Sequence, residues 1–225
     1  LEEKLLCPFH YFGVADPVSL NEDRFWKNGR YDPAELEKVY TGAHVQARQR
    51  LDAVFDSLKR YESDLEQVKG IGFCVSIQHA KYMAEMFDQQ GIPSAALVSG
   101  IDSAQCRSLL DKLRTGELTF LFTVDKLSEG LDVPDMNLVL FLRPTESLTV
   151  FMQQLGRGLR HAPGKDCLTV LDFVGQAHRK YRIDSKFKAL LPTHRFSIDR
   201  EVELDFPHLP LDAPSSSIVS PAPMS

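Results

Sequence analysis

The sequence lacks the features that mark several common classes of protein. Its four cysteines, Cys7, Cys74, Cys106 and Cys167, stand far apart without a C-x-x-C pair. A zinc site or a thiol redox motif is therefore not expected, and Cys74 and Cys167 are interpreted as small buried hydrophobes. No apolar run approaches the roughly 20 residues that span a bilayer, and no secretory signal is present. We expect a cytoplasmic protein with no membrane partner.

The chain also lacks an overall excess of positive charge. The formal net charge of its 225 residues is −5. Residues 147–188 nevertheless hold eight Lys or Arg and three Asp or Glu, an excess of +5, so the remainder carries −10. A local basic region matters more for binding phosphate than the overall balance does.

A complete phosphate-binding loop is absent as well. Residues 158–166 resemble a Walker A loop, but five residues separate the two glycines and Asp166 follows Lys165. The loop needs four residues there, and a Ser or Thr after the lysine to hold magnesium. We interpret the segment as a turn before a strand. Asp172, which ends an apolar run, is interpreted as a carboxylate that caps or pairs locally.

Apolar runs alternate with amphipathic stretches through the middle of the chain. We predict strands at 9–14, 71–75, 94–98, 118–124, 138–142 and 167–173, and a weak edge strand at 196–206. We predict helices at 42–68, around 80–87 and 106–113, and at 147–155. Strands that recur with helices between them indicate an α/β fold, with a parallel sheet covered by helices on both faces.

Three parts of the chain are distinguished by these patterns. Residues 1–69 form a lead-in segment with one strand and a long amphipathic helix. Residues 70–191 form the α/β lobe, and 192–225 form a C-terminal extension that is largely linker or disordered because it is rich in Pro and Ser. The sequence begins with Leu and is expected to be part of a longer protein.

The octet QQLGRGLR at 153–160 places Arg157 and Arg160 three residues apart, directly after a predicted helix. Cations at this spacing share one face of a helical turn, and the planar guanidinium group suits phosphate oxygens. The alternative is a solvated basic helix end, where arginine interacts favourably with the helix dipole.

The segment TVDKLSEGLDVP at 123–134 directly follows a predicted strand. Gly130 lets the backbone approach a ligand closely, Asp132 suits ribose hydroxyls, and Thr123 suits a backbone phosphate of a nucleic acid. An ordinary strand-to-turn connection is the alternative. The weaker segment at 73–80 predicts a strand that runs into a capped helix, with His79 at the helix start and not a ligand or base.

In order, 73–80, 123–134 and 153–160 resemble motifs IV, V and VI of the superfamily 2 helicases. These motifs lie on the second, C-terminal lobe of a two-lobed motor. The resemblance implies a three-layer RecA-like sheet of the P-loop NTPase type that lacks its own phosphate loop. In detail, the strings look more like DNA-translocating groups, above all a bacterial type III restriction-like group, than like DEAD-box RNA helicases.

The resemblance also implies roles for individual residues. Arg157 and Arg160 would be catalytic arginine fingers on the γ-phosphate of ATP. The other implied contacts are to the nucleotide, through Gly130, Asp132 and Gln153, and to one nucleic-acid strand, through Ser76, Ser99, Gly100 and Thr123. ATP and Mg²⁺ would be held mainly by the first RecA-like lobe. The partners implied are that lobe and a nucleic acid, DNA in preference to RNA.

Other functions remain open at this point. The same sheet could serve as a non-catalytic nucleic-acid or protein binding module. A nucleotide-dependent transferase is a weaker alternative, because Gly70-Ile71-Gly72 precedes its predicted strand and lacks the third glycine of a dinucleotide-binding turn. Under the helicase interpretation, the lobe alone is not expected to hydrolyse ATP.

Overall fold

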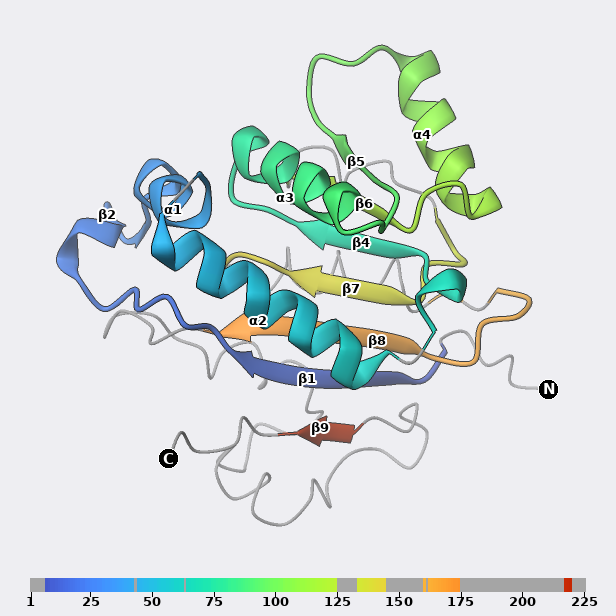
Figure 1. Cartoon of the computed structure of the whole chain (residues 1–225), viewed down its shortest axis with the longest axis horizontal. Coiled ribbons are helices and arrows are strands. Elements are labelled where there is room, and N and C mark those ends of the chain that lie inside the picture. The colour runs from blue at the N-terminus through green and yellow to red at the C-terminus, as the bar shows by residue number, and fades with distance from the viewer. Residues whose placement is uncertain are drawn as a thin grey trace.

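A computed structural model describes residues 7–42, 44–62, 64–124, 133–144, 160, 162–174 and 217–219. Within these residues, seven parallel strands form one sheet in the order β5-β6-β4-β7-β8-β1-β9 (Figure 1). The strands are β1 (Phe9–Ala15), β4 (Gly70–Phe73), β5 (Ser94–Leu97), β6 (Phe120–Thr123), β7 (Leu138–Phe141), β8 (Leu168–Val174) and β9 (Ser217–Val219). The predicted parallel sheet is confirmed.

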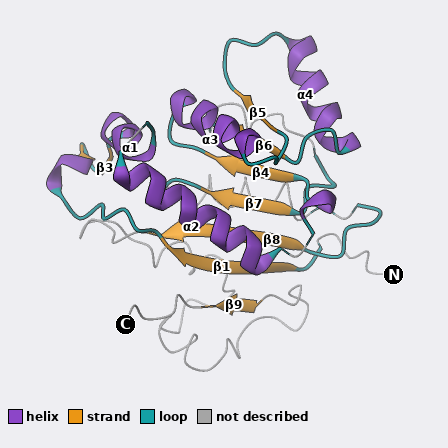
Figure 2. Ribbon diagram, viewed as in Figure 1, coloured by secondary structure: helices purple, strands orange, loops and turns teal. Residues whose placement is uncertain are grey.

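Helices cover both faces of this sheet. Helices α2 (Val45–Tyr61) and α3 (Ile77–Gln89) lie across one face (Figure 2), and α4 (Ser103–Thr115) contributes to the core on the other. Alternate residues of β6 supply both cores, since Phe120 and Phe122 join the α2–α3 side and Leu121 joins the α4 side. The three-layer α/β arrangement is therefore confirmed.

Helix α4 begins after Asp102 and ends at Gly116. The Asp102 carboxylate accepts hydrogen bonds from the backbone N–H groups of Ala104, at 2.8 Å, and Gln105, at 2.7 Å. Gly116 ends the helix in the left-handed conformation, with φ of 82°. Asp before a helix accepts from backbone N–H groups that have no partner within the helix. Gly after a helix adopts the left-handed conformation without the steric cost that a side chain would add.

The strand predicted from residue 71 begins one residue earlier, so Gly70 and Gly72 are both strand residues. Both lie in β4, beneath the rings of Phe120 and Phe122 on the adjacent strand β6. A Cβ on either glycine would overlap those rings. The two glycines therefore serve close packing between strands, which explains why they lead to no dinucleotide-binding turn.

The predicted lead-in segment is more elaborate than one strand and one helix. β1 pairs with β8 over its full length, from Phe9 opposite Leu168 to Ala15 opposite Val174. After β1, the chain forms the 3-10 helix η1 (Asp23–Phe25), the hairpin β2 (Trp26–Lys27) and β3 (Arg30–Tyr31), and helix α1 (Pro33–Tyr40). This insertion has its own small core and was not predicted.

Two predictions near the ends of the chain's elements differ from the structure: the bounds of one helix, and the absence of regular structure in the C-terminal extension. The long helix predicted at 42–68 is α2 at Val45–Tyr61, followed by the 3-10 helix η2 (Leu65–Gln67). β9, which pairs with β1, lies in the extension predicted to be largely linker. The helix predicted at 147–155 and the strand predicted at 196–206 lie outside the described residues.

Candidate nucleotide and nucleic-acid site

The predicted strand-contact residues meet at the carboxyl edge of the sheet. Leu97 of β5 and Phe73 of β4 both pair with Thr123 of β6. The segments that follow β4 and β5 therefore lie beside the end of β6, and they carry Ser76 and Ser99. The structure thus brings three predicted contact points together at the carboxyl ends of adjacent strands, where ligands of open α/β sheets bind.

These residues differ in what they offer to a ligand. Ser99 and Gly100 are exposed, and Gly100 adopts a φ of 98°, which favours glycine. Ser76 is half-buried and caps α3, because its hydroxyl accepts a hydrogen bond from the His79 N–H at 3.1 Å. Thr123, which was also predicted to contact a nucleic-acid strand, is buried.

Thr123 is fully buried, and its hydroxyl donates to the Val124 carbonyl at 3.4 Å. Because β6 is covered on both faces, its side chains point into one core or the other, whatever their polarity. The Thr123 side chain therefore presents no surface to a nucleic-acid strand in this structure. Ser76 and Ser99 still lie together at this edge, as the predicted strand contacts require.

A buried arginine that the sequence did not reveal lies under the same edge. Arg50 of α2 forms an ion pair with Asp16 at 2.6 Å and donates to the Leu142 carbonyl at 2.9 Å. Its guanidinium lies 3.9 Å from the ring centroid of Tyr40 and 3.4 Å from His79 Nε2. Arg50 thereby joins the chain after β1, helix α1, the start of α3 and the end of β7.

The surroundings of Arg50 also set the protonation of its neighbours. Burial lowers the pKa of His79 well below its usual range, and the Arg50 cation adds to this effect. His79 Nδ1 faces the Val75 N–H at 3.3 Å, and the ring is fully buried. Burial raises the pKa of the Cys74 thiol, which keeps the thiol protonated. His79 stands in the first turn of α3, as predicted, and is a core residue.

At the opposite, amino edge of the sheet, Lys165 joins two of the segments recognised in the sequence. Its ammonium donates to the Pro134 carbonyl at 3.1 Å and to the Arg160 carbonyl at 3.2 Å. The Lys165 N–H bonds the Ala162 carbonyl, and Gly164 has a φ of 78°, so this segment is a turn. The interpretation of this segment as a turn is confirmed for residues 162–165.

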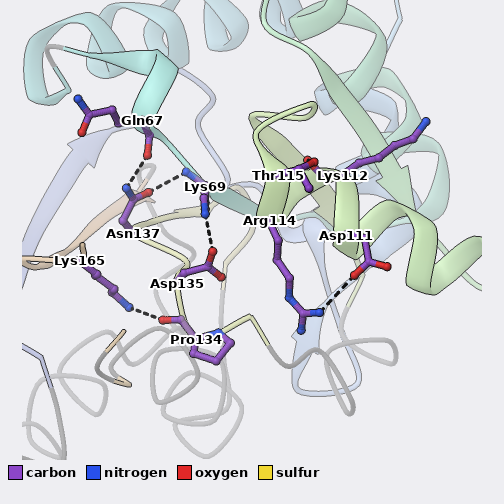
Figure 3. Close-up of polar contacts among 10 residues, drawn as sticks. All are labelled: Gln67, Lys69, Asp111, Lys112, Arg114, Thr115, Pro134, Asp135, Asn137 and Lys165. Carbon is purple, nitrogen blue, oxygen red and sulfur yellow. Dashed lines mark hydrogen bonds and ion pairs between the residues drawn. The ribbon is translucent and has the colours of Figure 1, made fainter. Parts of the chain in front are cut away.

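Further polar contacts hold the chain between Pro134 and β7 (Figure 3). The Lys69 ammonium meets the Asp135 carboxylate at 2.5 Å. Asn137 accepts from the Lys69 N–H and donates to the Gln67 carbonyl, both at 2.8 Å. The loop that follows residues 123–132 is thus fixed from the side of β4 as well as from Lys165.

Asp172 pairs within the sheet. Its carboxylate is 1% exposed and accepts a hydrogen bond from the Tyr11 hydroxyl of β1 at 2.5 Å. The expectation that Asp172 caps or pairs locally was wrong, because Asp172 lies inside β8 and its partner Tyr11 belongs to β1, far away in the sequence. Across the described ranges, no group of three His, Cys, Asp or Glu side chains is arranged to hold a metal ion.

Four predicted site residues, Gly130, Asp132, Gln153 and Arg157, lie outside the described residues. Arg160 is described, and its side chain is exposed. In the described part of the chain, no helix has the length and apolar character needed to cross a membrane.

The order of strands and the position of these segments define a RecA-like α/β lobe. The yeast DEAD-box splicing factor Prp28 has a similar fold, with a TM-score of 0.59 at 17% sequence identity. That similarity covers 98% of this chain and 37% of the Prp28 chain. The predicted RecA-like fold is therefore confirmed.

Residues 49–162, more than half of the chain, match the helicase conserved C-terminal domain. The chain belongs to this family, and the resemblance to the second lobe of superfamily 2 helicases is confirmed.

Two curated relatives illustrate the similarity. The chain is 29% identical over 117 residues to IRC3 of Saccharomyces cerevisiae, named as an ATP-dependent helicase, covering 52% of this chain and 17% of that protein. It is 34% identical over 135 residues to UvrABC system protein B of Chlamydia pneumoniae, covering 56% and 18%. The chain thus spans less than a fifth of the length of these two relatives.

Proposed function

We propose that this chain is the second lobe of an ATP-dependent helicase or translocase that acts on nucleic acid. The first RecA-like lobe supplies the phosphate loop and the magnesium ligands that this sequence lacks. ATP, when bound between the lobes, supplies the phosphoryl-transfer chemistry that drives movement. On this proposal the chain contributes arginine fingers and contacts to one nucleic-acid strand.

The gathering of Ser76, Ser99 and Gly100 at the ends of adjacent strands, in a chain of the helicase family, carries the proposal. Exposed backbone and hydroxyl groups at this edge suit the phosphates of a strand, which fix position and not sequence.

The side chains assigned to the nucleotide side also suit ATP as a ligand. Arg160 is an exposed cation at the end of 153–160, and its backbone is tied to the chain that directly follows Asp132. Arg157 and Arg160 would hold the γ-phosphate, and Gly130, Asp132 and Gln153 the rest of the nucleotide. An exposed guanidinium stabilises charge that develops during phosphoryl transfer without a proton moving.

DNA is proposed as the substrate in preference to RNA, and a type III restriction-like group as the nearest branch of the superfamily. The DNA preference rests on Glu129–Pro134 and on Gln153 and Gln154, and the branch rests on the strings at 73–76, 142–147 and 153–160. Competition of single-stranded DNA against RNA of the same sequence for the protein tests this part, and tighter binding of the RNA would contradict it.

The main test uses the protein that includes both lobes. We expect Arg160→Ala to bind ATP nearly as well as the wild type but to lose nucleic-acid-stimulated hydrolysis by about 10³-fold or more, as arginine fingers do. Arg60→Ala removes another exposed arginine, on α2, and is the matched control. Wild-type turnover in the Arg160 variant, or magnesium-dependent hydrolysis by this chain alone, would refute the proposal.

A further inference from the structure

Lys165 occupies an unusual position for a lysine. It is 9% exposed, and burial lowers the pKa of its ammonium, while the Cys7 thiol, the Asp135 carboxylate and Cys167 act in the opposite direction. Burying a charge is costly unless it is well bonded. Two backbone carbonyls, those of Pro134 and Arg160, together with Cys7, meet the three donors of the ammonium.

The two carbonyls belong to different functional segments. Pro134 ends 123–134, two residues after Asp132, and Arg160 ends 153–160. Because both accept from one ammonium, Lys165 sets the spacing between these two chain segments directly. A hydrogen bond from a charged donor is about twice as strong as one from a neutral donor, so these two bonds stabilise the spacing between the segments.

Lys69 provides a comparison within the same loop. It reaches Asp135, one residue beyond Pro134, through an ion pair, and its backbone bonds Asn137 (Figure 3). No contact in the described residues joins the Lys69 side chain to Arg160. Lys69 therefore fixes the loop to β4, whereas Lys165 fixes it to the segment that ends in Arg160.

We propose that Lys165 is a positioning residue for the nucleotide site, which holds Pro134, two residues after Asp132, in register with Arg160. This inference rests on the proposed function, since it assigns Asp132 and Arg160 to the nucleotide. Lys165 touches neither nucleotide nor nucleic acid, and it acts through the backbone of the two segments.

The test measures binding of a non-hydrolysable fluorescent ATP analogue to the two-lobed protein. Lys165→Met keeps the length of the side chain and removes its donors. We expect affinity for the analogue to fall about tenfold, as for other residues that couple to a site without touching the ligand. Lys69→Met, the matched control, leaves this affinity unchanged. Hydrogen exchange of residues 133–137 without nucleotide should quicken in the Lys165 variant.

A double-variant cycle separates positioning from a general loss of stability. In an Asp132→Ala background, Lys165→Met should lower affinity much less than in the wild type, because Asp132 is gone and the Arg160 side chain contributes little to ATP binding. Equal losses in both backgrounds, or unchanged affinity and exchange in the single variant, would overturn the inference. If Lys165→Met does not fold, Lys165→Gln is measured against the same criteria.

The cycle also keeps the two proposals apart. If Asp132→Ala alone leaves analogue affinity unchanged, the assignment of the nucleotide site fails. If Asp132→Ala weakens binding and Lys165→Met does not, the proposed function stands and only the role of Lys165 is lost.

Discussion

At the carboxyl edge of the sheet, Arg50 and Asp16 form an ion pair whose side chains are 2% and 1% exposed. At the amino edge, Lys69 and Asp135 form a pair of similar length whose side chains are 29% and 26% exposed. Both pairs hold a connection to the sheet. Water still reaches the Lys69–Asp135 pair, so a charge that loses its partner there remains solvated. At the carboxyl edge, a charge that loses its partner remains buried without a counter-charge.

The comparison also separates two kinds of site. Arg50, His79 and Tyr40 form a closed cluster that supports the edge from beneath, and nothing in it is open to a ligand. At the amino edge, the Lys165 contacts hold the half-buried Pro134 next to the exposed Arg160, whereas Lys69 only ties the same loop to β4. The Arg50 cluster is therefore expected to set stability, and the Lys165 contacts to set the geometry of the nucleotide side.

The largest effect is expected from Arg50→Met. It leaves the Asp16 carboxylate buried without its cation, a change that costs about 3–5 kcal/mol. Urea unfolding of this chain measures the loss, and Arg48→Met, an exposed arginine on the same helix, should cost less than about 0.5 kcal/mol.

Adding Asp16→Leu to Arg50→Met should restore part of the stability, since no charge is then left buried. A cost below about 1 kcal/mol for Arg50→Met alone would show that the buried pair contributes no more stability than a surface pair. That result would contradict the proposed difference between the two ion pairs.

A second effect arises from His79 and appears on acidification. Its folded pKa lies well below the usual value of 6.5, so the unfolded chain binds the proton first as pH falls. Stability is therefore complete above pH 6.5 and is lost below it, by at most about 1.4 kcal/mol per pH unit.

His79→Gln, which keeps a polar side chain but does not titrate, should flatten the dependence of stability on pH between 7.5 and 5. Urea unfolding at several pH values gives both curves. Parallel curves for wild type and variant would mean that acid does not act through His79.

Much of the fold could be predicted because its signals are local. The apolar runs that became β4 to β8 are short and separated by helical spacing, and Asp102 and Gly116 mark α4 within one turn of its ends. The hairpin β2–β3 was missed because its strands have two residues each, too few to show a period. Its turn did carry a signal, since Asn28-Gly29 adopts the positive φ angles typical of tight hairpins.

The site could be predicted only in part, because its supporting residues depend on contacts between distant segments. Arg50 interrupts the apolar stripe of α2, and a charged residue in such a stripe is normally taken to be solvated. Its partners Asp16 and Leu142 are distant in sequence. Lys165 lies in a segment that resembles a phosphate loop, and nothing in the sequence indicates that its ammonium bonds two carbonyls.

The smallest effect is expected from Lys69→Met, which tests the amino edge of the comparison. Because the Lys69–Asp135 pair is partly exposed, its loss should cost at most about 1 kcal/mol, and less in high salt. Lys59→Met, an exposed lysine on α2, serves as the control in urea unfolding at low and high salt. Asn137 still bonds the Lys69 backbone in the variant, so the loop keeps its link to β4. A loss above about 2 kcal/mol would place this pair in the range of buried ones, and exposure would no longer explain the difference between the two edges.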